Sequence, residues 1–392
     1  MLTRRERLLA ALGGGEVPNP VSASPARGNV TGSPTDRIPL LGGWVLGDRL
    51  HQAITGCSQE EYWRDPARYA VEAHRLLGVD GMIALHVPRE PGDYRDGLTK
   101  EQFEAYKDRY PSVEDVLTHV RALPSPRDAA RAFDAESWRD AFRAHVLAMQ
   151  ARMGELVYLP TLWEEVHPKF EWYNDFGYEN YVLFLHLYRE EAYRFFESLA
   201  AVTRRKSEMA AQVFRELDLV PMTLTGTDIC GRNGPVVSPA LLREVYWPHV
   251  RVSQEPMREA GIKMVWHSDG DFRPIAPDIL AAGADGFQGF QEEFGVDLAA
   301  LAQMRTREGR PLVLWAGPSV TTTLPFGTVT EVKRDVERII NTLAGAGPLF
   351  ILPANNILPD CPVGNVVAMH RHVIEYGQKV ISFGAKRDYE EG

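Results

Sequence analysis

The chain has 392 residues, of which 44% are hydrophobic and 24% charged, a balance typical of a soluble globular protein with one large domain or two smaller ones. Its net charge is −10 and it has no dense run of lysine and arginine, so nucleic acid is not an expected partner. No apolar run approaches the roughly 20 residues that span a bilayer, so a membrane is not expected either. Three widely spaced cysteines without a CxxC pair, and an N-terminus unlike a signal peptide, predict a cytoplasmic protein without disulfides or a zinc ribbon.

The N-terminal segment begins with a short amphipathic helix, expected over residues 3–12. Thr3 and Glu6 have the spacing of a capping box, in which each side chain bonds the other residue's backbone. Residues 13–36 are rich in glycine, proline, serine and asparagine and show no apolar period. This composition predicts a loop, or a lid over a site.

Eight short apolar runs of strand length then alternate with helical patterns. The expected strands cover residues 38–41, 81–85, 156–159, 219–225, 262–266, 286–290, 312–315 and 350–352. Residues 98–153, broken by prolines, predict a helical insertion between the second and third strands. The other expected helices cover residues 65–77, 179–217 (two helices), 275–282, 298–307, 328–343 and 366–376, with a further helix opening at Ser238-Pro239.

Eight strands interleaved with helices predict the α/β class and a (β/α)8 TIM barrel, with an N-terminal extension and the helical insertion, as a single domain over residues 1–392. A doubly wound open sheet is the alternative. Such a sheet normally carries a glycine-rich nucleotide loop after its first strand, and Gly42-Gly43 does not have that pattern.

Polar side chains gather where the expected strands end, which is where a barrel of this kind places its active site. These residues are His86, Glu164, His167, Asp228, His267, Asp269, Gln291 and Asn355. The fifth strand stops at His267-Ser268-Asp269-Gly270. If the chain stays extended there, the imidazole of His267 and the carboxylate of Asp269 face the same side, which suits metal chelation or proton transfer.

Most of these residues have a structural alternative to a functional role. Asp228 could act on the substrate or cap its own loop. The remaining candidates form a substrate-binding set, although its histidines could equally be buried structural residues, and a tryptophan near a strand end is often part of the core. This set comprises His86, Trp163, Glu164, His167 and Gln291.

Several of these motifs, in this order and spacing, resemble the uroporphyrinogen decarboxylase superfamily, which includes corrinoid-linked methyltransferases. The resemblance is strongest from about residue 228 to residue 377. It is carried by Asp228 with Gly234-Pro235-Val236-Val237-Ser238-Pro239, by His267-Ser268-Asp269-Gly270, by Gly283-Ala284-Asp285, by Gly327-Thr328, by Asp360-Cys361-Pro362 with Asn365, and by Tyr376-Gly377. The resemblance implies a (β/α)8 barrel, in agreement with the strand count.

The methyltransferase branch of that superfamily has His-x-Cys after the fifth strand and a second cysteine after the eighth, which together hold zinc. Here His267 is kept, while Asp269 and Asn355 stand at the two cysteine positions. The resemblance therefore implies a site of His267, Asp269 and Asn355 for zinc or a harder divalent ion such as manganese, iron or magnesium, or else a metal-free hydrogen-bonding group.

The porphyrinogen-decarboxylating branch has an arginine-rich loop after the first strand and an aspartate at the end of the second. This chain has Gly42-Gly43-Trp44 and His86 at those places, with Arg37 and Arg49 as the nearby arginines. A substrate with many carboxylates needs several arginine contacts, so porphyrinogen decarboxylation is not expected.

The resemblance implies an enzyme that moves a methyl group between a small or aromatic substrate and a corrinoid held on a partner protein. Asp228, His267 and Asp269 would carry the chemistry, by holding a metal, polarising the substrate heteroatom or managing protons. The alternatives are a decarboxylase or lyase acting on a small carboxylate, and a non-catalytic binding subunit. Self-association into an oligomer is left open.

Overall fold

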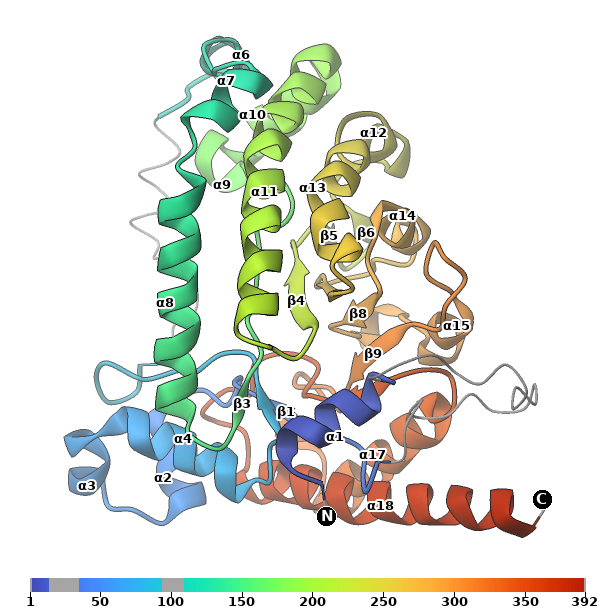
Figure 1. The fold of residues 1–392 in the computed structure, drawn as a ribbon. Helices are drawn as coiled ribbons and strands as arrows, with labels where there is room; N and C mark the ends of the chain where they lie inside the picture. The colour runs from blue at the N-terminus through green and yellow to red at the C-terminus, as the bar shows by residue number, and fades with distance from the viewer. Residues whose placement is uncertain (1, 14–34, 94–108, 391–392) are drawn as a thin grey trace.

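The computed structural model describes residues 2–13, 35–93 and 109–390 as an α/β protein with parallel sheets and many helices (Figure 1). One sheet has the order β1 (Leu41–Gly42), β2 (Gly81–Met82) and β3 (Val157–Tyr158). The other has the order β10 (Leu349–Ile351), β9 (Val313–Ala316), β8 (Gly286–Gln288), β7 (Lys263–His267) and β4 (Met222–Gly226). The hairpin of β5 (Cys230–Gly231) and β6 (Gly234–Pro235) is antiparallel.

Two isolated parallel bridges connect the two sheets. Leu40, next to β1, pairs with Ile351 of β10, and Thr161, beyond β3, pairs with Leu224 of β4. Through the pairings and bridges, each of the eight parallel strands in the described ranges has a parallel neighbour on both sides. Every strand expected from the sequence overlaps one of these strands, although most of the observed strands are shorter.

The register of the larger sheet sets neighbouring strand ends at one edge. In it His267, the last residue of β7, pairs with Gly226 of β4 on one side and Gln288 of β8 on the other. Residues that follow these three positions therefore start from the same edge of the sheet, although they are far apart in the sequence.

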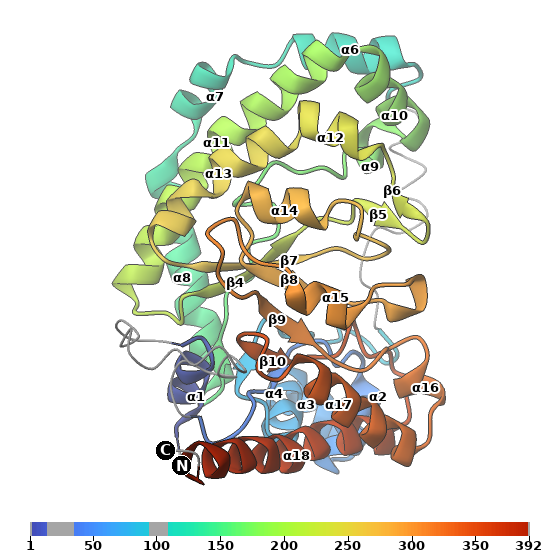
Figure 2. The ribbon, with the colours of Figure 1, turned by 90° about the vertical axis from the view of Figure 1, so that its right-hand side faces the viewer.

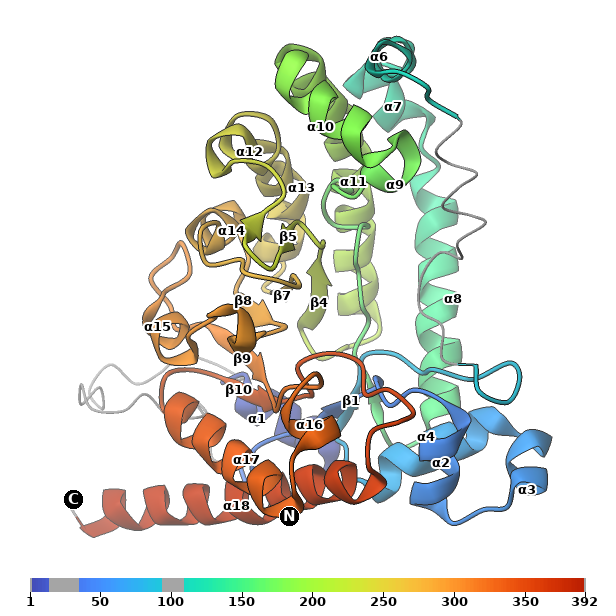
Figure 3. The same cartoon turned by 180° about the vertical axis from the view of Figure 1, so that it is seen from behind.

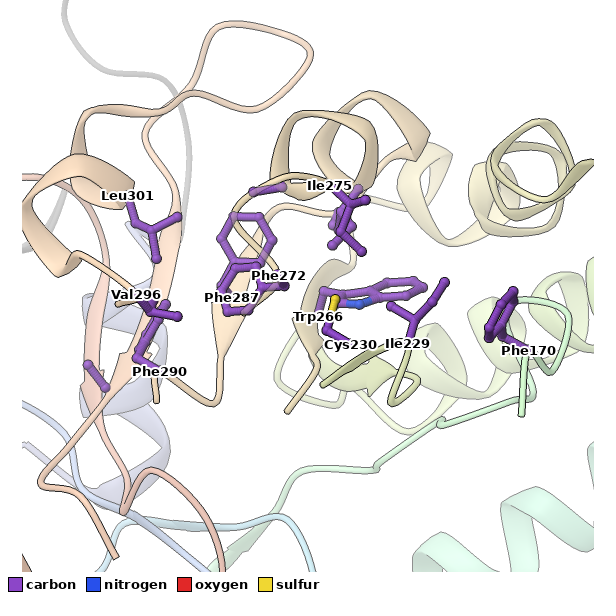
Figure 4. Close-up of a cluster of buried hydrophobic side chains, with 14 of the residues drawn as sticks. Phe170, Ile229, Cys230, Trp266, Phe272, Ile275, Phe287, Phe290, Val296 and Leu301 are labelled. Atoms are coloured by element: carbon purple, nitrogen blue, oxygen red, sulfur yellow. The ribbon is translucent and has the colours of Figure 1, made fainter. Parts of the chain in front are cut away.

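Alternate residues of the strands form two apolar layers, as the period of two in a strand requires. One layer holds residues such as Leu224, Val265 and Phe350, and α1 packs Leu8 and Ala11 against it. The other layer faces the helices. Figure 4 shows part of this second layer, where Trp266, Phe272 and Phe287 are fully buried.

Seventeen α-helices and one 3-10 helix are assigned within the described residues. They are α1 (Arg4–Ala11), α2 (Asp48–Thr55), α3 (Gln59–Arg64), α4 (Pro66–Leu76), α6 (Val113–Arg121), α7 (Pro126–Ala132), α8 (Ala135–Met153), α9 (Tyr173–Phe176), α10 (Tyr178–Leu187), α11 (Arg189–Glu216), α12 (Pro239–Val245), α13 (Trp247–Glu259), α14 (Ala276–Ala282), α15 (Leu298–Gln303), α16 (Thr323–Phe326), α17 (Val329–Leu343), α18 (Val363–Glu390) and η1 (Glu292–Phe294).

The helix starts predicted from capping residues are confirmed. Thr3 with Glu6 and Thr328 with Glu331 each make both bonds of a capping box, and the Ser238 side chain accepts from the backbone at the start of α12. The sequence did not predict α2, α3, α9 or α16. The helix expected to open at Ser238-Pro239 is two helices, α12 and α13, and Pro256 lies inside α13, where a proline normally argues against a helix.

The predicted insertion contains α6, α7 and α8, and its residues 98–108 lie outside the described ranges. The predicted lid over residues 13–36 lies almost entirely outside them as well. Figure 2 shows α6, α7 and α10 at one end of the molecule and α18 at the other, and in Figure 3 α8 runs beside α11, which it contacts. No helix in the parts of the chain that the structure describes is both long and apolar enough to cross a membrane.

Candidate active site

A cavity of about 790 Å³ lies at the carboxyl ends of the parallel strands. It is bordered by the segments that follow β1, β2, β3, β4, β7 and β10. The aromatic, acidic and other polar side chains at its border include Trp44, His86, Trp163, Glu164, Glu171, Asp228, His267, Asp269 and Asn355. Six of the eight residues expected at the strand ends therefore share one cavity, and His167 and Gln291 do not line it.

His267 stands at the centre of this arrangement. Its side chain is 6% exposed, and its ring lies edge-on to Trp44 at 5.9 Å and to Trp163 at 5.3 Å between centroids. Its Nε2 faces two carboxylates, with the nearest oxygens of Asp228 and Asp269 each at 3.7 Å. The expected convergence of imidazole and carboxylate after β7 is thus present, and Asp228 joins it from β4.

Two glycines make room for His267. A Cβ atom on Gly226 would lie 2.1 Å from the His267 carbonyl oxygen, and one on Gly289 would lie 2.8 Å from Nδ1 of the ring. Both glycines have positive φ, +138° and +89°, which side-chain-bearing residues rarely adopt. Gly226 at the end of β4 and Gly289 after β8 therefore allow the imidazole to sit in this position.

The hydrogen bond to Gln288 decides which ring nitrogen of His267 donates. The Gln288 amide nitrogen donates to the carbonyl of Ala354 at 3.0 Å, so its oxygen is left to accept from Nδ1 of His267. With Nδ1 donating to Gln288, the imidazole tautomer that carries one proton presents the lone pair of Nε2 to the two carboxylates. A lone pair facing two anionic oxygens calls for a cation between them, either a proton or a metal ion.

The donor set fits a divalent metal. One ligand atom each from Asp228, His267 and Asp269 lie within 4.8 Å of one another. One imidazole nitrogen and two carboxylate oxygens are ligands that zinc, manganese and iron accept. The Nδ1 bond to Gln288 is the outer contact by which metal-ligating histidines are usually oriented.

Neighbouring groups hold the two carboxylates in place. The backbone nitrogen of Asp269 donates to Asp228 Oδ1 at 2.9 Å. The Glu171 carboxylate accepts from the backbone nitrogen of Asp228 at 2.8 Å and from the Thr227 hydroxyl at 2.9 Å. Burial, followed by the proximity of Asp228, raises the pKa of Asp269, whereas His267 and Asn355 act in the opposite direction.

Asn355 hydrogen-bonds the carboxylate of Asp269. Its amide nitrogen donates to both Asp269 oxygens, and its own oxygen accepts from the backbone nitrogen of Asn356 at 2.6 Å. The predicted ligand set of His267, Asp269 and Asn355 stays a prediction. In the structure Asp228 brings a carboxylate oxygen to 3.7 Å from His267 Nε2, whereas Asn355 turns its amide nitrogen toward Asp269.

Glu164 is half-buried on the cavity wall, between Trp163 and the segment that carries Glu171. Burial raises its pKa from the usual 4.5 to about 7, and the neighbouring Lys169 limits the rise. His86 also lines the cavity, and its Nε2 is buried with no hydrogen-bond partner among the described residues. Both side chains line the cavity, and their role in substrate binding stays a prediction.

His167 is placed elsewhere. It is fully buried, its ring nitrogens lie 3.0 Å from the carbonyl of Pro168 and 3.1 Å from that of Gly226, and burial lowers its pKa to about 4. Substrate binding by His167 does not fit this position, because the ring has no access to the cavity. It is the buried structural histidine that the sequence left as an alternative.

Gln291 is likewise outside the cavity, where its side-chain oxygen accepts from the backbone nitrogen of Gly270 at 2.6 Å. The glutamine that touches His267 is Gln288, which lies inside β8 and is fully buried. Gln288 was missed, although a glutamine within a buried strand was a signal in itself. Glu171 was missed because it lies well beyond the end of its strand.

The two cysteines nearest the strand-end loops are buried thiols. Burial raises the pKa of Cys230 to about 12 and that of Cys361 to about 11, so both stay protonated at neutral pH. Neither lines the cavity, and Cys361 donates to the Leu324 carbonyl. Trp315, a third tryptophan near a strand end, is buried in the apolar layer that α1 covers.

Among solved structures, the chain is similar to a methyltransferase from Methanosarcina mazei. The two share 16% sequence identity with a TM-score of 0.57, over 96% of this chain and 99% of that chain. Identity this low establishes a shared fold and leaves the reaction open. The sequence matches no protein-family model and no curated protein.

Proposed function

We propose that the chain is a single (β/α)8 barrel of the uroporphyrinogen decarboxylase superfamily. It would act as a corrinoid-linked methyltransferase on a small or aromatic substrate. The fold part is supported by the eight parallel strands, by the two bridges that connect their sheets, and by the likeness to a solved methyltransferase over nearly the full length of both chains. The reaction part rests on one observation, the convergence of Asp228, His267 and Asp269 on one open cavity.

In this proposal His267 Nε2, Asp228 and Asp269 hold a divalent ion, zinc or a harder metal. Gln288 fixes the imidazole, Asn355 fixes Asp269, and the cavity admits the substrate. A bound ion would act as a Lewis acid that polarises the substrate heteroatom. The cavity walls, Trp44 and Trp163 in particular, would exclude water and orient the methyl group toward an acceptor on the partner protein.

The alternative of a lyase acting on a small carboxylate has less support. Glu164 could deliver a proton near neutral pH, as decarboxylation requires. However, none of the described residues that border the cavity is a lysine or arginine, and four of them are carboxylates. A carboxylate substrate would therefore meet repulsion unless the metal received it.

The decisive test is methyl transfer to free reduced cobalamin, followed by the change in its visible absorbance, with a panel of methylated oxygen, sulfur and nitrogen compounds. Turnover of donors whose heteroatom keeps a lone pair should require added metal and should be lost in His267→Ala. The control is His186→Ala, an exposed histidine on α10. If metal-loaded protein transfers no methyl group from any donor, but releases carbon dioxide from a small carboxylate, the lyase alternative holds.

A further inference from the structure

The cavity carries an excess of negative charge. Glu164, Glu171, Asp228 and Asp269 all border it, and its described lining includes no lysine or arginine. Lys169 is the cation that acts on Glu164. Lys169 does not border the cavity. Its amine pairs with Asp175 at 2.9 Å and lies 5.2 Å from the centre of the Trp172 ring.

Two indole rings border the same cavity. Trp44 and Trp163 flank His267, and Trp163 is 37% exposed although its neighbour Leu162 is buried. Aromatic faces attract cations, and the attraction grows when water is excluded. Carboxylates and indole rings around one cavity are the elements by which proteins recognise quaternary ammonium compounds.

From these two features we infer that the methyl-bearing substrate is a small cation, a quaternary ammonium or sulfonium compound. The inference rests on the proposed function and names its substrate class. A metal ion on Asp228, His267 and Asp269 would offset two of the carboxylates. The groups that then favour a cation over a neutral or anionic substrate are Glu164, Glu171 and the two tryptophans.

Transfer from such a cation breaks a carbon–nitrogen or carbon–sulfur bond, and the heteroatom keeps the electron pair and leaves as a neutral amine or thioether. The pair for the new bond to carbon comes from the methyl acceptor, a reduced corrinoid in the proposed function. A quaternary nitrogen has no lone pair that a metal could polarise, and it leaves as a neutral amine, so for this substrate class the metal is not expected to assist the bond breaking.

The test compares choline with 3,3-dimethylbutan-1-ol, which has the same shape without the charge, and with the anion 4-methoxybenzoate. Binding is measured by titration calorimetry on the full chain, both metal-free and zinc-loaded. Choline should bind at least about tenfold more tightly than the neutral alcohol in both states. Equal binding of the pair, undetectable binding of both, or preference for the anion overturns the inference.

Two variants locate the recognition. At pH 8, where Glu164 is mostly ionised, Trp163→Leu and Glu164→Gln should each weaken choline binding several-fold and the weak binding of the neutral alcohol much less, whereas a general folding defect would reduce both equally. The remote variant Trp138→Leu, on α8, serves as the control for loss of an indole.

Failure of the inference and failure of the proposed function give different results. Tight cation binding without methyl transfer from any donor leaves cation recognition by the cavity standing and refutes the methyltransferase. Methyl transfer from neutral or anionic donors alone leaves the methyltransferase standing and refutes the inference.

Discussion

The amide nitrogen of Asn355 donates to both carboxylate oxygens of Asp269, at 2.9 and 3.0 Å, across 86 residues of sequence. Asn355 follows β10 and Asp269 follows β7, so this contact ties two separate loops together at the cavity. It orients the carboxylate that faces His267 and stabilises its charged form. Asn355 is thus a positioning residue for the candidate metal site.

Replacing Asn355 by alanine should weaken metal binding without abolishing it. Loss of an outer contact of this kind typically lowers metal affinity by about 10–100-fold. Titration with cobalt, whose visible spectrum reports ligand geometry, would show both the weaker binding and an altered spectrum. Unchanged affinity and spectrum would mean that Asp269 is not a ligand.

His267→Ala should abolish metal binding, whereas Cys230→Ala and Cys361→Ala should each leave the metal stoichiometry unchanged. The reason is that the two thiols are buried, protonated and outside the cavity. Elemental analysis after dialysis against zinc, with and without a chelator, measures this. Stoichiometric zinc that survives the chelator and requires either cysteine would restore a thiolate site and reject ours.

Gly289→Ala should displace the His267 ring and reduce metal binding, because its Cβ would lie 2.8 Å from Nδ1. The positive φ of +89° adds a cost of about 1–3 kcal/mol in stability. Gly309→Ala is the matched control, since φ is +77° there and no atom lies within 4 Å of the new Cβ. Thermal unfolding should show destabilisation in both variants, and metal titration a defect only in Gly289→Ala.

Cation binding should strengthen as the pH rises from about 6 to 8. The pKa of Glu164 is raised to about 7, by burial first and also by Glu171, Glu165 and Asp175, with Lys169 opposing. The carboxyl is therefore mostly neutral at pH 6 and mostly ionised at pH 8, and only the ionised form attracts a cation. Choline titrations across this range should show the trend, and Glu164→Gln should remove it. A steep dependence that persists in Glu164→Gln would assign it to another group.

Asp80→Asn should destabilise the protein strongly without altering the cavity. Asp80 is fully buried and accepts from Arg7 at 2.6 Å and Arg37 at 2.8 Å, joining α1 to the start of β2. Removing one partner of a buried ion pair typically costs about 3–5 kcal/mol. The comparison is Asp218→Asn, whose pair with Arg5 of the same helix is exposed and contributes about 1 kcal/mol or less. Denaturant unfolding should separate the two, and equal losses would refute a special role for Asp80.

The sequence predicted the order of the strands and most of the helices, and many of the residues at which they begin and end. Capping boxes such as Thr3 with Glu6 are local, because the bonding groups lie three residues apart in the chain. The strands could be found because their apolar runs are short and end at polar residues. The side-by-side placement of His267 and Asp269 also followed from local geometry, since two positions along an extended chain return to the same face.

The choice among polar residues near the strand ends was made by the tertiary structure. His167 and Gln291 looked equivalent to His86 in the sequence, yet His167 is buried against backbone carbonyls and Gln291 binds the Gly270 backbone. Only the pairing of β8 with β7 brings Gln288 to His267. Register between strands is fixed by distant packing, and a shift of one residue would turn each side chain to the other face.

The chain by itself therefore determined that an imidazole and a carboxylate meet after β7, because two residues of one strand end carry them. The tertiary structure decided that Asp228 completes this group and that Asn355 supports it from the side. Each of these contacts joins loops 41 or more residues apart. Such loops are brought together only when the strands pair in order and the cores on both faces of the sheet are packed.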